Sequence, residues 1–231
     1  MERLGIKMKV CCISDLHGQL PDYSSIEADL FCICGDFSPC DIQKNEVFMH
    51  NWIIEKFKPW CEALNCEKVL FIAGNHDFYP VNNKSEMVRL FPQNEKVTYI
   101  EDQLYDYKGR RIYGTPWCKI FMDWAFMKPD KELELIYDNI PENLDLLLTH
   151  DCPYGSGDVI MQKASKYYTP DHIGNKPLLK AIETKKPKRA CNGHLHSSEH
   201  NWQKLYDTER CNVAVIDETY KLAYEPRIFE I

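Results

Sequence analysis

Five apolar, strand-like runs along the chain are each followed by a segment that carries metal-binding residue types. The runs are Val10–Ser14, Leu30–Cys34, Lys68–Ala73, Leu144–Leu148 and Ala190–Asn192. Side chains just past the carboxyl ends of strands in an open α/β sheet converge on one crevice. We therefore expect the residues after these runs to lie together at one edge of a sheet, which limits the fold to an α/β architecture.

The segments that follow the runs share ligand chemistry. They read Asp15-Leu16-His17, Gly35-Asp36, Gly74-Asn75-His76-Asp77, Thr149-His150 and Gly193-His194-Leu195-His196. Together they can supply two Asp, one Asn and four His to one place. A set of this size exceeds the needs of one ion and suits two ions that share a carboxylate. Mixed imidazole and carboxylate ligands favour Mn, Fe, Zn, Co or Ni over Mg or Ca.

Such a pair of ions has a known use. Two ions about 3.5–4 Å apart stabilise both the attacking and the leaving oxygens of an in-line displacement at phosphorus. A bound cation also lowers the pKa of water, so that a hydroxide is available near neutral pH. The pattern therefore indicates hydrolysis of a phosphate ester by a metal-bound hydroxide.

The ordered motifs D-x-H, G-D, G-N-H-D, T-H and G-H-x-H, from Asp15 to His196, resemble those of the calcineurin-like metallophosphoesterase superfamily. The segments Tyr113–Trp117 and Thr149–Pro153 are further similar to its metallophosphoesterase-domain, or cyclic-nucleotide phosphodiesterase-like, subgroup. The resemblance implies a four-layer α/β/β/α sandwich of two mixed sheets flanked by helices. The order of the expected elements accommodates the same arrangement.

The resemblance also implies roles for individual residues. It assigns Asp15, His17 and His196 to one ion, Asn75, His150 and His194 to the other, and Asp36 to both. A neutral amide such as that of Asn75 is a useful ligand only where other groups already supply charge. The alternative for Asn75 is a turn residue, because Gly-Asn is a good turn pair.

His76 and Asp77 are the expected catalytic residues. A cationic His76 beside the ions could donate to a phosphate oxygen or protonate the departing alkoxide. Asp77 could orient the His76 ring and raise its pKa. The alternative for Asp77 is a cap of the segment that follows.

Composition limits the other classes of function. A chain of 231 residues that is 44% hydrophobic can form a single domain, 1–231, with a full core. The net charge of −7 provides no basic field for nucleic acid or an anionic membrane, so we expect neither partner. The one basic cluster, Lys185–Arg189, is expected to be a helix end followed by a strand. No apolar stretch approaches the roughly 18 residues that a membrane span requires.

Eleven cysteines are scattered through the chain, several of them inside apolar runs. A buried free cysteine behaves as a small hydrophobe. The count is odd and Met1–Lys9 does not read as a signal peptide, so we expect a reducing cytoplasmic location.

The remaining elements are expected as follows. Helices are predicted over Asp41–Leu64, interrupted at Pro59, and over Lys131–Asn139 and Asn175–Thr184; strands over Val97–Ile100, Gln103–Tyr107, Arg111–Gly114, His200–Tyr206, Cys211–Ile216 and Arg227–Ile231. Two segments, Cys118–Asn143 and Gly155–Gly174, leave or precede a ligand segment and are either walls of a substrate cleft or peripheral packing.

We expect a dinuclear metal-dependent phosphoesterase that acts on a small phosphodiester. The chain is short, and Trp117 and Tyr167-Tyr168 could offer flat faces to a base. Trp117 could equally be a core or edge aromatic. A phosphomonoesterase at the same site and a non-catalytic scaffold are the alternatives, and the presence of every ligand type argues against the scaffold. A nuclease would need a basic groove. The sequence leaves the oligomeric state open.

Overall fold

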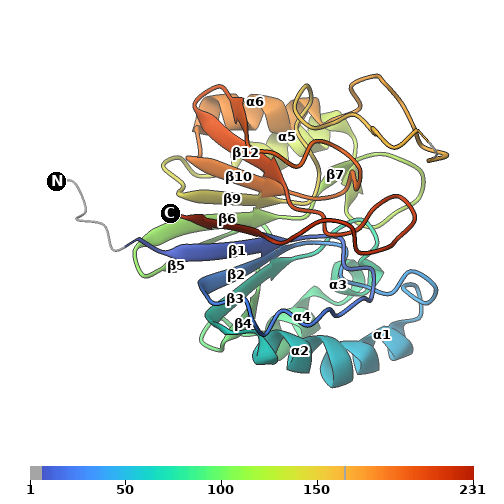
Figure 1. Cartoon of the computed structure of the whole chain (residues 1–231), viewed down its shortest axis with the longest axis vertical. Coiled ribbons are helices and arrows are strands. Elements are labelled where there is room, and N and C mark those ends of the chain that lie inside the picture. Colours follow the sequence, from blue (N-terminus) through green and yellow to red (C-terminus); the bar gives the residue numbers. More distant parts are fainter. Residues whose placement is uncertain (1–6, 164) are drawn as a thin grey trace.

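The structure is a computed structural model and describes residues 7–163 and 165–231. Two β-sheets pack face to face at its centre, and helices lie on the outer side of each sheet (Figure 1). The first sheet contains, in order, β13 (Arg227–Glu230), β1 (Lys9–Ile13), β2 (Ala28–Cys34), β3 (Cys66–Ile72) and β4 (Val97–Tyr99). The second contains β11 (Gln203–Leu205), β12 (Thr208–Asn212), β10 (Arg189–Asn192), β9 (Leu146–Thr149), β6 (Arg110–Thr115) and β5 (Gln103–Tyr107).

Both sheets are parallel at the centre and antiparallel at an edge. Strands β1 to β4 pair in parallel and β13 joins β1 antiparallel. In the second sheet β6, β9, β10 and β12 are parallel, with β5 and β11 antiparallel at the two edges. The predicted sandwich of two mixed sheets flanked by helices is confirmed. The parallel strands bring the carboxyl ends of β1, β2 and β3 to one edge, and those of β9 and β10 to the matching edge of the other sheet.

The alternating direction of side chains along each strand produces an apolar layer on either face of the sheet. In β1, Cys11 and Ile13 belong to the apolar cluster on the helix side, whereas Val10 and Cys12 belong to the cluster between the sheets. Successive side chains of a strand point to opposite faces, so a strand buried on both faces reads as a continuous apolar run. This is why the ligand-bearing strands are recognisable in the sequence.

The long helical segment under the first sheet begins later than predicted. Residues 41–44 form turns, Asn45 caps the helix through a hydrogen bond from the Phe48 amide, and α1 spans Glu46–Trp52. The interruption expected at Pro59 takes the form of a π-helical turn, η1 (Ile53–Phe57), directly before α2 (Lys58–Ala63). Two short helices, α3 (Phe78–Asn82) and α4 (Lys84–Leu90), follow β3.

Helices α5 (Asp130–Asp138) and α6 (Lys176–Lys185) cover the second sheet. The Asn175 side chain accepts a hydrogen bond from the Leu178 amide, so the predicted cap of α6 is present. Strands β4, β11 and β13 are shorter than predicted. In place of the predicted Cys211–Ile216 strand, β12 begins earlier, at Thr208, and ends at Asn212. Two very short strands, β7 (Cys118–Lys119) and β8 (Met127–Lys128), lie within the segment Cys118–Asn143.

All eleven cysteines are free. Nine of them belong to apolar clusters or pack against one, as expected for small hydrophobes: Cys11, Cys12, Cys32, Cys34, Cys61, Cys66, Cys152, Cys191 and Cys211. The two others, Cys40 and Cys118, lie outside these clusters and beside the residues described in the next section.

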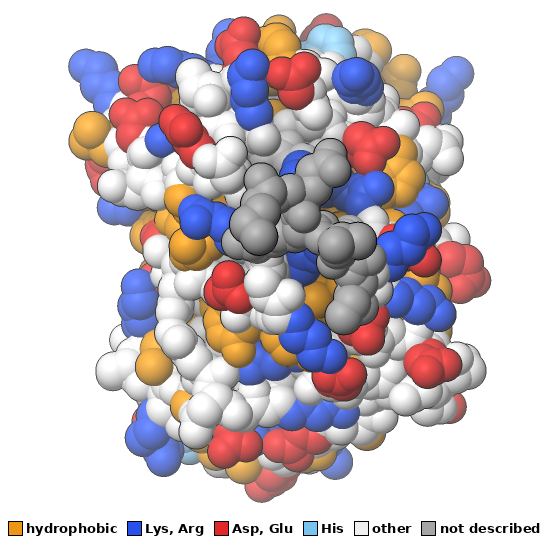
Figure 2. All heavy atoms as spheres, turned by 90° about the vertical axis from the view of Figure 1, so that its left-hand side faces the viewer, with side chains coloured by type: hydrophobic (Ala, Val, Ile, Leu, Met, Phe, Trp, Pro, Cys, Tyr) orange, Lys and Arg blue, Asp and Glu red, His pale blue; other side chains and the backbone are white. Residues whose placement is uncertain are grey.

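The basic cluster has the expected structure, because α6 ends at Lys185 and β10 begins at Arg189. Lys188 pairs with Asp145 at 2.8 Å and Arg189 with Glu209 at 3.0 Å. Figure 2, which views the molecule from the left of Figure 1, shows Lys and Arg side chains mixed with Asp and Glu. Across residues 7–163 and 165–231, no helix has both the length and the apolar character that crossing a membrane demands.

Candidate metal centre

Five short loops follow β1, β2, β3, β9 and β10, and we call residues 14–18, 35–38, 74–77, 149–151 and 193–197 the ligand loops. Main-chain hydrogen bonds join them to one another. The Asp15 amide donates to the Gly35 carbonyl at 3.0 Å, and the His17 amide donates to the Asp36 carbonyl at 2.8 Å. The His76 amide donates to the Asp36 carboxylate at 2.7 Å. These bonds join the loops after β1, β2 and β3, the third of them through the carboxylate of Asp36 itself.

Two positions of the motifs require glycine because an acidic side chain from another loop lies against the backbone there. A Cβ on Gly74 would collide with the Asp36 carboxylate, and a Cβ on Gly193 would collide with the Asp15 carboxylate. The glycine in each motif therefore makes room for an acidic side chain from a different loop.

Four expected ligands adopt the left-handed backbone region that non-glycine residues rarely occupy. The φ angles are 59° at Asp15, 45° at His17, 53° at Asp36 and 73° at His194. Each such residue costs about 1–3 kcal/mol, and such residues cluster at active sites and ligand clamps. The chain thus accepts strain where it aims these side chains.

The first group of donor atoms comes from the loops after β1 and β10. The Nε2 atoms of His17 and His196 lie 3.2 Å apart. His196 Nε2 is 3.3 Å from Asp15 Oδ1, and His17 Nε2 is 3.9 Å from the same oxygen. Three donor atoms at these separations can surround one ion.

The second group comes from the loops after β3, β9 and β10. His150 Nε2 lies 2.9 Å from Asn75 Oδ1, and the rings of His150 and His194 have centroids 5.2 Å apart. Asp36 lies between the two groups, since its Oδ2 is 3.6 Å from His17 Nε2 and 3.3 Å from His150 Nε2. A carboxylate shared by two ions would need this position.

The electrostatics of the buried site suit cations. Burial would raise the pKa of Asp36, but His150 and His76 hold it well below its usual value. Burial lowers the pKa of His17 to about 3, which keeps this ring neutral. Within the part of the chain that the structure describes, Asp15 and Asp36 form ion pairs with histidines alone. Two buried carboxylates among imidazoles and one amide are a donor set that transition metal ions fit.

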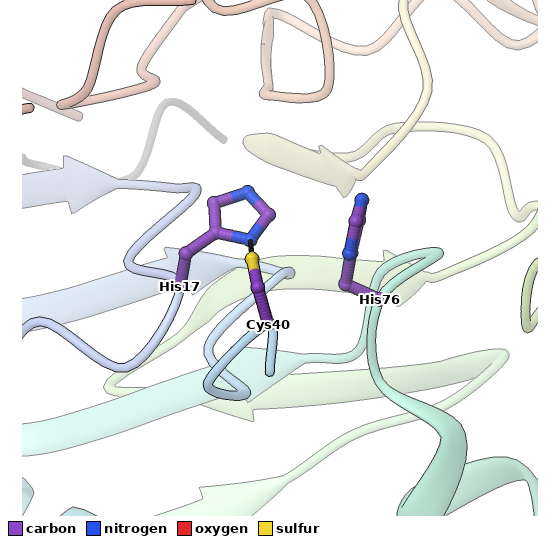
Figure 3. Close-up of side chains that lie close together, drawn as sticks. All are labelled: His17, Cys40 and His76. Carbon is purple, nitrogen blue, oxygen red and sulfur yellow. Dashed lines mark hydrogen bonds between the residues drawn. The ribbon is translucent and has the colours of Figure 1, made fainter. Parts of the chain in front are cut away.

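The Nδ1 atoms of three expected histidine ligands, His17, His150 and His196, have different partners. His150 Nδ1 donates to the Cys34 carbonyl at 2.8 Å, and His196 Nδ1 donates to the Asp217 carbonyl at 3.2 Å. His17 Nδ1 instead lies 3.0 Å from the thiol sulfur of Cys40 (Figure 3). Such contacts fix the orientation of a ligating ring.

His76 lies beside the two groups and is partly buried. Its ring stands edge-on to the ring of His17 (Figure 3). The centroids of these two rings are 4.7 Å apart, and the His76 ring also packs against Trp124 at 4.3 Å. Its Nδ1 faces the side-chain oxygen of Gln43 at 2.9 Å. Burial lowers the pKa of His76, in the direction opposite to the rise expected from Asp77.

The expected pairing of Asp77 with the His76 ring is wrong. The Asp77 carboxylate accepts main-chain hydrogen bonds from Gly74 at 2.7 Å, Asp36 at 2.8 Å and Ser38 at 2.9 Å. It is fully buried, and although Asp77 occupies the N-cap position of α3 as the alternative expects, its side chain makes no capping hydrogen bond there. Adjacency in the sequence suggested a pair, but the carboxylate turns inward and ties two ligand loops together.

A cavity of about 340 Å³ opens next to the two groups of donor atoms, and Asp36, Asn75, His76, His194 and His196 form part of its lining. Its other lining comes mostly from two stretches, residues 119–124 and 160–173, which we call the wall segments: Lys119, Ile120, Phe121, Trp124, Ile160, Tyr167, Thr169 and Ile173. Part of each segment therefore lines the cavity, as the first alternative expects, and the use of the cavity by a substrate stays a prediction.

Trp117 is not among the residues that line this cavity. Its indole nitrogen donates to Asp102 at 2.7 Å, and its ring packs edge-on against Phe126. Trp117 is partly buried and packs against two apolar clusters, so the alternative of a core or edge aromatic describes it. Trp124, seven residues further along, provides the aromatic face beside His76.

Sequence reasoning missed several residues near the site: Cys40, Gln43, Trp124, Glu218 and Tyr220. Tyr220 meets the rings of both His17 and His196 at centroid distances of 4.9 and 5.3 Å. None of these residues lies in a motif, and only Trp124, an aromatic in a candidate wall, carried a usable signal.

Known proteins resemble this chain in sequence. The chain is 28% identical to "UPF0046 protein C25E10.12" of Caenorhabditis elegans over 97% of its own length and 81% of that protein. It is 29% identical to "Metallophosphoesterase domain-containing protein 1" of Homo sapiens over 80% of its own length, but spans only 59% of that relative.

Two solved structures share the fold. The protein TT1561 of Thermus thermophilus matches with a TM-score of 0.56 and 14% identity, over 92% of this chain and 91% of that one. "Phosphopantetheinyl Hydrolase (PptH) from Mycobacterium tuberculosis" matches with a TM-score of 0.53 and 12% identity, over 94% and 92%. Residues 8–198, which include all the ligand loops, match the family described as "Calcineurin-like phosphoesterase". The chain belongs to the calcineurin-like phosphoesterase family.

Proposed function

We propose that this chain is a dinuclear metal-dependent phosphoesterase that hydrolyses a small phosphodiester. The position of the Asp36 carboxylate between two groups of donor atoms carries the proposal. One ion would be held by Asp15, His17, Asp36 and His196, and the other by Asp36, Asn75, His150 and His194. Bound there, two Mn, Fe, Zn, Co or Ni ions would activate water and stabilise charge on the phosphate oxygens.

His76 is the proposed acid for the leaving oxygen. It lines the cavity, and Gln43 and Trp124 hold its ring from two sides. A ring held with Nδ1 toward Gln43 has Nε2 free to carry a proton. Such a positioned acid contributes about 10²–10⁴-fold to a rate. Asp77 is proposed to position the loops rather than to touch the substrate.

The cavity supports a diester over a monoester. It lies directly beside His76, where the leaving group must depart, and its volume of about 340 Å³ is within the range of small-molecule sites. Its aromatic and apolar lining suits an ester group with a flat apolar part, such as a nucleoside. A monoester of a small alcohol would leave most of this surface without a partner.

The experiment compares kcat/KM for bis-p-nitrophenyl phosphate, p-nitrophenyl phosphate and 2′,3′-cyclic nucleotides with Mn²⁺ at pH 7–8. The diesters should be preferred. A preference for p-nitrophenyl phosphate would support a phosphomonoesterase at the same site. Absence of turnover in protein that holds two ions would support a non-catalytic scaffold.

We also propose a location for the chain and a limit on its partners. The eleven free cysteines support a reducing compartment such as the cytoplasm. A submicromolar, steeply salt-dependent affinity for DNA would contradict the expectation that the chain does not bind long nucleic acid.

A further inference from the structure

Two thiols differ from the other nine because they lie outside the apolar clusters and next to metal-binding residues. Cys40 is grouped with His17 and His76, and Cys118 is grouped with His150 and His194. In each group the possible ligand atoms all lie within 4.8 Å of one another. A cysteine that served only as a small hydrophobe would be expected among apolar neighbours, as the other nine are.

The Cys118 thiol is held at the second group of donor atoms. The main-chain amide of Cys118 donates to the Phe126 carbonyl at 2.8 Å, which fixes the start of β7. The side chain is fully buried, and its thiol makes a long hydrogen bond of 3.5 Å to the carbonyl of Pro116, two residues away. A thiol is a weak donor, so this bond does little to hold it.

A thiol at this place would favour particular metal ions. Sulfur ligands select zinc and other thiophilic ions, whereas Mg, Ca and Mn prefer oxygen. His150, His194 and a thiolate together form a set of nitrogen and sulfur ligands typical of zinc. The donors of the first group are nitrogen and oxygen atoms, so the two halves of the site differ in softness.

We infer that Cys118 is a further ligand of the second ion and that it makes this half of the centre selective for a thiophilic ion such as Zn²⁺ or Co²⁺. This inference rests on the proposed dinuclear site. Binding would convert the thiol to a thiolate, and the displaced proton would pass to solvent.

Cys40 does not have the same relation to the centre. Its sulfur lies against Nδ1 of His17 (Figure 3). Nε2 of that ring faces Asp15, Asp36 and His196. The Cys40 thiol therefore lies behind a proposed ligand, and the Cys118 thiol lies beside two. Cys40 is the matched control.

The test uses X-ray absorption of the zinc-loaded protein and optical spectra of the cobalt-loaded protein. Wild type and Cys40→Ser should show a sulfur neighbour at about 2.3 Å from zinc, and a sulfur-to-cobalt charge-transfer band in the near ultraviolet. Cys118→Ser should lack both features. A wild-type protein that binds two zinc ions without a sulfur neighbour would overturn the inference, and so would a sulfur signal that Cys40→Ser removes.

A second measurement does not depend on spectra. Calorimetric titration with Zn²⁺ in two buffers of different ionisation enthalpy counts released protons, and wild type should release about one more than Cys118→Ser. Equal release would contradict thiolate ligation. If Cys118→Ser does not fold, the wild-type absorption spectrum alone decides. Wild-type protein that binds no ions at all would instead refute the proposed function.

Discussion

The ligand loops and the wall segments line the same cavity but are built in opposite ways. Main-chain hydrogen bonds join the ligand loops to one another, and Asp15, Asp36 and His150 are all 1% exposed or less. The wall segments instead expose large apolar side chains at the cavity, with Ile120 59% and Phe121 45% exposed. The contacts of the ligand loops are therefore made within the protein, whereas the wall segments keep apolar surface that a partner or substrate can cover.

This difference separates chemistry from selectivity. A substitution in a ligand loop removes a metal donor, a proton donor or a contact between loops, so its effect should depend on the bond that breaks and not on the group that the walls contact. A substitution in a wall segment removes a contact with one part of the substrate, so its effect should depend on what that substrate carries. The predictions below test this division, beginning with the largest effect.

The largest effect should come from Asp36→Ala. Because the Asp36 carboxylate lies between the two groups of donor atoms, its removal should cost both ions and all measurable hydrolysis. Elemental analysis of dialysed protein measures the ions. Asp138→Ala removes an exposed carboxylate on α5 and is the control. Two ions retained in Asp36→Ala would remove the bridging assignment.

His76→Ala should keep both ions and lose about 10²–10⁴-fold in turnover of an alkyl ester. The loss should shrink for p-nitrophenyl esters, because p-nitrophenolate departs without a proton. Steady-state rates with both classes of ester measure it. An equally large loss with both classes would mean that His76 does not protonate the leaving group.

The same division explains what the sequence could predict. The ligand loops were predictable because their requirements are local: an apolar strand, a glycine such as Gly74 that leaves room for a carboxylate, and a ligand at the strand end. The role of Asp77 was not, because adjacent residues can point in opposite directions and its partners are main-chain amides. The walls were located, but the choice of Trp124 over Trp117 depends on packing that no local pattern encodes.

Asp77→Asn should weaken the ligand loops without removing a ligand. Both Asp77 oxygens accept hydrogen bonds, and an amide nitrogen in place of one would face a main-chain donor. A buried donor without a partner costs about 1–3 kcal/mol of stability. Loss of such a supporting contact weakens metal affinity by about 10–100-fold. Urea unfolding of metal-free protein and metal titration measure the two effects, and unchanged values of both would refute the positioning role.

Trp124→Ala should lower kcat/KM for a cyclic nucleotide by roughly five- to 150-fold, equivalent to the 1–3 kcal/mol that stacking contributes per base. The effect on bis-p-nitrophenyl phosphate should be smaller. Trp117→Ala is the matched control, because Trp117 does not line the cavity and should affect stability rather than kcat/KM. A larger kinetic loss in Trp117→Ala would reverse the assignment of the two tryptophans.

Phe121→Ala should have the smallest effect, confined to KM. The Phe121 ring lines the cavity and meets Tyr167 edge-on at 6.3 Å, but Trp124, not Phe121, packs against His76. Because Phe121 remains 45% exposed, a substrate can bury only part of it. Burying such an area is worth about 1 kcal/mol, or roughly fivefold in KM. The rise should appear with a nucleotide and not with p-nitrophenyl phosphate, which is too small to reach both wall segments, and kcat should stay constant.

Val47→Ala, which alters an apolar side chain 75% exposed on α1, controls for general surface effects. If Phe121→Ala lowers kcat as much as Trp124→Ala does, the walls take part in the chemistry, and the division between the two regions fails.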